Sequence, residues 1–199
     1  MTRIFKNLLI SLTFFFLILK PCYSIDELDA IKYIENVGQK AIDILKTPIE
    51  NLEKRELLFE QMLNNNFDKK LIHRAVLGKA SRGASKEQLL RFGEAFDKHI
   101  VKVYASQLGV YSNQLFIIDK AYKKGKKDTI VSSHIEHETA PPLRIDWRLR
   151  DRGEGTKIID IAIEGVSLLA TKRADFGASI KKGGLHALII DLETKNAQN

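Results

Sequence analysis

The 199-residue chain has a single cysteine, Cys22, and its N-terminal apolar run is too short to cross a bilayer. A membrane-spanning helix needs about 20 apolar residues, whereas the stretch Leu8–Leu19 has 12. Basic residues precede this stretch and Cys22-Tyr23-Ser24 follows it, which is typical of a secretory signal peptide rather than a membrane anchor. We therefore expect residues 1–24 to be cleaved on export. The mature chain would then contain no disulfide bond.

A strong net charge is also absent. The expected signal peptide carries three basic residues and no acidic one, so its removal lowers the net charge from +7 to +4. Such a mildly basic protein can work near anionic surfaces. The basic run Lys123–Lys127 lacks interleaved aromatic residues, and export argues against a nucleic-acid partner. This run is either a solvated turn or a contact with an anionic surface.

The common catalytic and metal-binding motifs are missing as well. There is no nucleophile elbow, no glycine-rich phosphate loop and no H-E-x-x-H motif. His134 and His137 are three residues apart on an expected strand, where their side chains point to opposite faces and cannot hold one ion. Asp146, Asp160 and Glu164 have the chemistry for acid–base work, but Asp146 alternates with arginines on the polar face of its strand and is expected to take part in charge pairs across strands. We expect no catalytic residue, no metal site and no cofactor.

The first half of the mature chain has helical periodicity. Apolar residues recur at three- and four-residue steps, and Pro48 ends the first such segment. Ser85 and Gln88 form a capping box, in which each side chain accepts a hydrogen bond from the other residue's backbone N–H. The expected helices are 26–46, 51–63, 68–77 and 85–108.

The pattern changes to strand-like alternation after residue 113. Four strands are expected, at 114–119, 128–138, 143–150 and 157–164. The third is the clearest, because Leu143, Ile145, Trp147 and Leu149 all point to one face. Short links containing glycine predict antiparallel pairing of consecutive strands. A turn at Glu164–Ser167 would lead into closing helices at 167–180 and 185–192, followed by a frayed polar tail.

These elements predict one α+β domain over residues 25–199, with a helical part at 26–109, a sheet at 114–164 and closing helices at 167–192. The helices would cover the apolar face of a mostly antiparallel sheet of about four strands. An apolar cavity between the two layers is one expectation, and a solidly packed interaction module is the alternative. Apolar alternation is the same for a filled core and an open slot, so the sequence leaves both open.

Two stretches resemble the MlaC (toluene-tolerance) family. Asp160–Leu168, with Arg173, Phe176 and Ile180 after it, is similar to the C-terminal signature of that family. The segment from Leu77 to Tyr104 is similar to its central helical signature. The chain departs from the family at 80–81, where it has Ala-Ser instead of aromatic residues, and at 186–187, where it has His-Ala instead of Asp-Gly.

The resemblance implies a periplasmic phospholipid carrier of an Mla-type system. Such a carrier shuttles lipid between an outer-membrane lipoprotein complex and an inner-membrane ABC transporter complex with an MCE-domain subunit, touching membrane surfaces transiently. The implied fold is a curved sheet covered by helices, with the acyl chains of a bound phospholipid between them and its head group outside. Hopanoid-associated members of the family leave the lipid class open. A small exported enzyme with Asp160 or Glu164 as its base is the alternative from another functional class.

Strand faces and helix stripes predict which residues would line the cavity. The six candidates are Ile145, Trp147, Ile161, Val166, Leu169 and Phe176. The turn at Glu164–Ser167 would then act as a hinge that sets the width of the slot. Four basic residues are candidates for contacts with a head group or a partner protein, on the basis of charge: Lys123, Lys124, Arg148 and Arg150.

Overall fold

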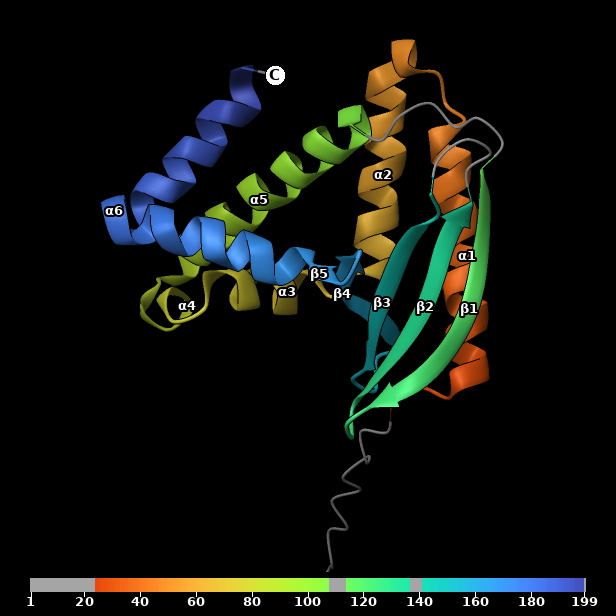
Figure 1. Cartoon of the computed structure of the whole chain (residues 1–199). Coiled ribbons are helices and arrows are strands. Elements are labelled where there is room, and N and C mark those ends of the chain that lie inside the picture. The colour runs from red at the N-terminus through yellow and green to blue at the C-terminus, as the bar shows by residue number, and fades with distance from the viewer. Residues whose placement is uncertain (1–23, 108–113, 137–140, 199) are drawn as a thin grey trace, which may run out of the picture.

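The computed structural model of the chain describes residues 24–107, 114–136 and 141–198 (Figure 1). Residues 1–23 of the expected signal peptide and His137 lie outside the described residues. Within these ranges, no helix combines the length and the apolar character needed to cross a membrane. The fold is α+β, as expected, with a curved sheet on one side and several helices packed against it.

The sheet is antiparallel throughout and its five strands follow the order of the chain. Four are long, and they match the expected strands except that the first continues beyond residue 119, past a bulge between Ile118 and Lys120. The fifth strand has two residues and was not expected. The strands are β1 (Leu115–Lys124), β2 (Asp128–Glu136), β3 (Leu143–Asp151), β4 (Thr156–Ile163) and β5 (Val166–Ser167).

The turn after β4 is a hairpin and does not lead directly into a helix. Glu164 and Gly165 both have positive φ, at 49° and 79°, the backbone conformation of a two-residue type I′ turn. Glu164 is bound to β3 twice, because its N–H donates to Arg144 O at 3.0 Å and its carboxylate accepts from Arg144 N at 2.6 Å. These bonds hold the turn against the sheet, which argues against the expected hinge.

Three of the helices begin at side chains that cap them. Asp26 and Asp68 each accept a backbone N–H at 2.9 Å, from Leu28 and Leu71. The capping box is present, with Ser85 N–H donating to Gln88 Oε1 at 3.0 Å and the reciprocal bond at 3.1 Å. The helices are α1 (Glu27–Leu45), η1 (Ile49–Asn51), α2 (Leu52–Asn66), α3 (Lys69–Leu77), α4 (Ala80–Gly83), α5 (Lys86–Gln107) and α6 (Leu168–Gln198).

Helix α6 contains both closing helices, joined at Gly184, whose φ of 78° and ψ of 172° are not helical. Figure 1 shows the two halves meeting at a sharp bend, with the second half beside α5. The expectation of a frayed tail was wrong, because Asn196 is only 6% exposed and donates a hydrogen bond to Ala95 O at 2.9 Å. Long-range packing therefore orders the last turns of the chain.

Three apolar clusters hold the described elements together, of which the third joins α1, α2 and α5. Helix α1 packs on the sheet through Ala30, Ile34 and Val37, which are fully or almost fully buried. Gly38 on the same helix permits close approach of β1, because a methyl group at this position would overlap the ring of Phe116. The second cluster joins α3, α5 and α6 away from the sheet. Between these two packed regions the sheet and the helices stay apart.

Candidate functional site

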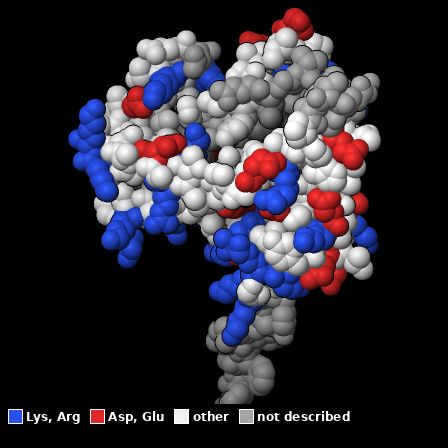
Figure 2. Space-filling view, in the orientation of Figure 1, with Lys and Arg blue, Asp and Glu red and all other residues white. Residues whose placement is uncertain are grey.

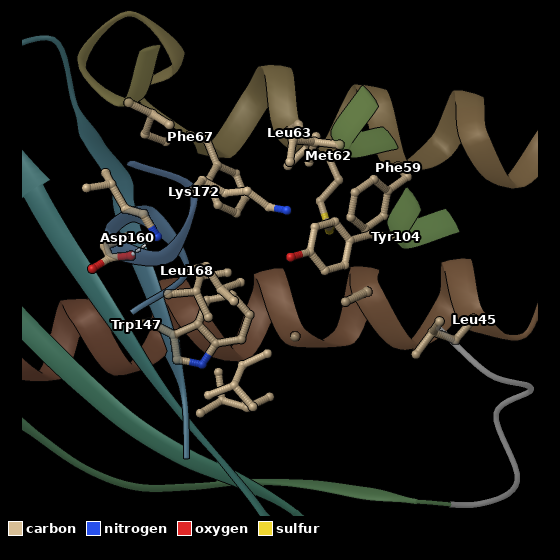
Figure 3. A pocket seen from close by; sticks show the side chains of 18 of the residues that line it. Leu45, Phe59, Met62, Leu63, Phe67, Tyr104, Trp147, Asp160, Leu168 and Lys172 are labelled. Atoms are coloured by element: carbon tan, nitrogen blue, oxygen red, sulfur yellow. Dashed lines mark hydrogen bonds between the residues drawn. The ribbon is translucent and has the colours of Figure 1, made fainter. Parts of the chain in front are cut away.

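A cavity of about 480 Å³ lies between the sheet and the helices (Figure 3). Its wall is formed by residues of α1, α2, α3, α5 and α6 on the helical side and of β1 to β4 on the sheet side. This volume lies in the range of about 300–1,000 Å³ that is usual for sites that bind small molecules. The sequence left a filled core and an open slot as alternatives, and the structure contains the slot.

The wall is mostly apolar. The helices contribute Leu45, Phe59, Met62, Leu63, Ile72 and Ile100. The sheet contributes Phe116, Ile135, Leu143, Ile145, Trp147 and Ile161. Buried water needs two to four polar partners, so most of this surface is suited to an apolar ligand and not to ordered solvent.

The structure places four of the six sequence-predicted residues on this wall: Ile145, Trp147, Ile161 and Leu169. Trp147 is held in place by two contacts. Its Nε1 donates to Ser133 Oγ at 2.9 Å, and its ring meets Phe116 edge-on at 6.2 Å. The register explains why Ile161 joins it, since the two residues are partners in the β3–β4 ladder.

The other two predicted residues lie elsewhere. Val166 follows the type I′ turn in β5 and is 60% exposed. Phe176 is buried in the cluster of α3, α5 and α6, where it meets the rings of Phe92 and Phe96 edge-on at 6.1 and 5.9 Å. Phe176 lies two turns beyond Leu169, and a rise of about 1.5 Å per residue separates them by about 10 Å along the helix. At the position of Phe176, helix α6 packs on α5 and no longer borders the cavity.

Sequence reasoning missed the contribution of the first helices to the wall. Ala41 of α1, Phe59 and Met62 of α2 and Tyr104 of α5 all line the cavity. Helices were predicted for these segments, but helical periodicity indicates only that one face of a helix is covered. Whether that face meets another side chain or an open space depends on how far apart the elements pack.

One group of charged residues in the wall is internally paired. Asp97 of α5 accepts contacts from Lys69 Nζ at 2.8 Å and from His73 Nε2 at 2.6 Å, both from α3. The His73 ring lies over Gly93, where an added methyl group would come within 2.8 Å of Nδ1. The three side chains therefore tie α3 to α5 at the edge of the cavity.

The carboxylates considered for catalysis are engaged in structural hydrogen bonds. Asp160 accepts from Ser167 Oγ at 2.7 Å and from Leu169 N–H at 3.2 Å, and so caps the start of α6. Glu164 is bonded to Arg144 in the turn described above. Asp146 accepts from Ser132 Oγ of β2 at 2.5 Å, and the arginine that lies 4.0 Å from its carboxylate, Arg144, is on the same strand and not across from it. Among the residues with described positions, no three His, Cys, Asp or Glu side chains are grouped as metal ligands.

Three of the four surface cations proposed for partner contacts bind within the protein. Arg148 and Arg150 both bond to the carboxylate of Asp128, whose side chain is 3% exposed. Burial alone would raise the pKa of Asp128, but the hydrogen bonds from Arg150 and Arg148 lower it below its usual value. Lys123 Nζ donates to the carbonyl oxygens of Ser24, at 3.1 Å, and Ile25. Figure 2 shows basic side chains gathered at the lower end of the sheet, where these residues lie.

The wall of the cavity has one more polar feature. Lys172 of α6 and Tyr104 of α5 both extend their polar ends into the cavity (Figure 3). Both residues are partly buried. Burial raises the pKa of Tyr104, so its hydroxyl stays protonated over the whole physiological pH range. The cavity therefore combines an apolar wall with an ammonium group and a hydroxyl donor.

Comparisons with known proteins agree with this fold. The family model described as "MlaC protein" matches residues 35–194. A toluene tolerance protein, ttg2D, from Pseudomonas putida is 24% identical over 106 residues, which cover 53% of this chain and 49% of the relative. The match thus spans about half the length of that relative.

A solved structure has the same fold. It is a phospholipid-binding protein from Ralstonia solanacearum, determined in complex with a phospholipid. Its TM-score is 0.75 at 24% sequence identity, and the alignment covers 84% of this chain and 96% of that one. Because the family model spans most of the sequence, from α1 to the last turns of α6, the chain belongs to the MlaC protein family.

Proposed function

We propose that this protein is a periplasmic lipid carrier that binds phospholipid with its acyl chains in the cavity between sheet and helices. The observation that carries the proposal is the apolar cavity of about 480 Å³ in a member of the MlaC family. The phospholipid found in the Ralstonia relative supports the same use of this fold. Bound lipid would be cargo and not a cofactor.

The energetics suit a carrier. Transfer of a CH₂ group from water to an apolar site gains about 0.8 kcal/mol, so a two-tailed lipid with about 30 such groups gains on the order of 24 kcal/mol. A bilayer gives a similar gain. The free energy of moving lipid between membrane and protein would then be close to zero, and no catalytic group is needed. The direction of transfer would come from the partners.

For the partners we propose an outer-membrane lipoprotein complex and an inner-membrane ABC transporter complex with an MCE-domain subunit. Membership of the MlaC family supports this assignment. The N-terminal pattern of basic residues, short apolar run and small residues supports export to the periplasm. A carrier of this kind would exchange lipid with each complex in turn and touch membrane surfaces only transiently.

The decisive experiment is lipid analysis of the mature protein purified from a periplasmic extract without detergent. Native mass spectrometry should show a complex heavier than the polypeptide by the mass of a lipid, and an organic extract should identify it. An unrelated periplasmic protein of similar size, taken through the same steps, is the control. Recovery of a hopanoid would change the lipid class but keep the carrier function. Absence of bound lipid, together with no uptake from phospholipid vesicles, would refute the proposal.

A further inference from the structure

The polar side chains of the cavity wall differ in whether they have a partner. Asp97 is bound by Lys69 and His73, and Asp160 is bound by Ser167 and Leu169. In the part of the chain with described positions, no hydrogen bond or ion pair joins Lys172 Nζ or the Tyr104 hydroxyl to another group. These two donors thus face the cavity without a partner among the described residues.

Both donors line the same cavity. Lys172 comes from the first half of α6 and Tyr104 from the last turns of α5, so they reach the cavity from different helices. Figure 3 shows the ammonium nitrogen and the phenol oxygen directed toward each other in the space between the labelled apolar side chains. Asp160 lies on the same wall, but the Lys172 ammonium extends away from it.

The charge of Lys172 acts on its surroundings without an anionic partner. Burial lowers the pKa of His99 on α5, and the positive charges of Lys172 and Lys195 lower it further. An ammonium group beside an apolar wall is costly unless a partner compensates its charge. An ammonium group offers three donors and a protonated tyrosine one, and an ionised oxygen group accepts them more strongly than a neutral one. The chemistry of the site therefore matches an anionic oxygen group joined to an apolar chain.

We propose that Lys172 and Tyr104 anchor the anionic group of the lipid cargo. The cavity would then select its ligand by the negative charge of this group as well as by the apolar acyl chains. This inference rests on the proposed function, because it concerns the same cavity. Two classes of lipid carry such a group at the end of acyl chains: the phosphodiester of a glycerophospholipid and the carboxylate of a free fatty acid. Both would place oxygen acceptors between the two donors.

The test measures selectivity in lipid exchange. The mature protein is incubated with phosphatidylglycerol vesicles that contain a minor fraction of diacylglycerol with the same acyl chains, and bound lipid is quantified by mass spectrometry. Wild type should enrich phosphatidylglycerol over its share in the vesicle. Lys172→Met keeps the apolar stem and removes the charge, so the enrichment should fall about tenfold. Tyr104→Phe removes only the hydroxyl and should cause a smaller fall. Uptake of diacylglycerol should not fall in either variant.

Lys181→Met is the matched control, because Lys181 is an exposed lysine on the same helix outside the cavity. It should keep the wild-type enrichment. Thermal unfolding of each variant shows whether the fold is kept, and Tyr104→Phe, which removes a single oxygen, still tests the site if Lys172→Met unfolds.

A second arm adds palmitic acid to the vesicles and identifies the anion. Uptake of palmitate that depends on Lys172 assigns the site to carboxylates, whereas enrichment of phosphatidylglycerol unaffected by palmitate assigns it to phosphate. Either result supports the anchor. Equal enrichment by wild type, Lys172→Met and Tyr104→Phe would overturn the anchor and leave the carrier function standing. A wild-type protein that takes up no lipid would overturn both.

Discussion

A substitution on α1 that fills the cavity can distinguish a lipid-binding site from an ordinary packed core. Ala41 is partly buried and lines the cavity beside the apolar residues of α2. The substitution Ala41→Phe would place an aromatic ring in space that a lipid chain is proposed to use. The two properties to be measured are the stability of the lipid-free protein and its affinity for lipid, and they should change in opposite directions.

The magnitudes follow from the volume that the ring takes up. A phenyl ring displaces roughly six methylene groups of an acyl chain, and at about 0.8 kcal/mol each the loss of binding free energy is up to about 5 kcal/mol. Rearrangement of the lipid reduces this figure, so we expect at least about a 30-fold loss of affinity, or about 2 kcal/mol. In the lipid-free protein, burial of the new ring stabilises by about 1.5–3 kcal/mol. The lower helix propensity of phenylalanine offsets about 0.5 kcal/mol of this gain.

The assay uses mature protein stripped of lipid by solvent extraction and refolded. Urea unfolding followed by circular dichroism gives the free energy of unfolding, and exchange from phospholipid vesicles gives the relative affinity. Ala178→Phe is the control, since Ala178 is an exposed alanine on α6 and its replacement should leave lipid uptake unchanged.

The opposite result has a clear meaning. If residue 41 were surrounded by tightly packed side chains, the added ring would force them apart and destabilise the protein by about 1–3 kcal/mol. A lipid-free Ala41→Phe variant that is less stable than wild type and takes up lipid normally would therefore refute both the open cavity at this position and its use for acyl chains.

Two further predictions concern carboxylates that stabilise the fold. Asp128→Asn should lower the free energy of unfolding by roughly 2 kcal/mol, less than a fully buried pair would lose, because Arg148 and Arg150 keep some contact with water. The pKa of Asp128 is lowered in the folded state, so its stabilising effect is complete above the usual aspartate pKa and is lost as the pH falls through the lowered value. Acid unfolding of Asp128→Asn should thus lack part of the wild-type pH dependence in the region below about pH 4, and an unchanged profile would contradict this assignment. Asp160→Ala should cost about 1 kcal/mol through loss of the cap on α6, as measured by thermal unfolding; an unaltered melting temperature would show that the cap contributes nothing.

Local patterns were sufficient for most of the secondary structure. The capping box at Ser85 and Gln88 involves groups three residues apart, and the structure contains both of its hydrogen bonds. Alternation in β3 correctly predicted that Ile145 and Trp147 share a buried face. Such features depend on neighbours in the chain, so the sequence carries them directly.

Other features depend on contacts between distant segments, and these were missed. A bulge between β3 and β4 pairs Arg148 with Asp160 but Leu149 with Ile158, which inserts Ile159 and leaves both isoleucines buried. Strict alternation along a strand would place them on opposite faces, only one of which is expected to be buried. The short strand β5 likewise exists only because the turn at Glu164 and Gly165 folds it back on β4.

The cavity also depends on contacts between distant segments, and the sequence left it as one of two alternatives. The sequence by itself determined the export signal pattern, the order of helices and strands, the apolar faces and the family signature. Only the tertiary structure decided that those faces enclose a space, that Val166 and Phe176 lie outside it, and that Lys172 and Tyr104 reach into it. The physical reason is that periodicity specifies which side of an element is apolar, whereas the distance between two apolar sides is set by how the whole chain packs.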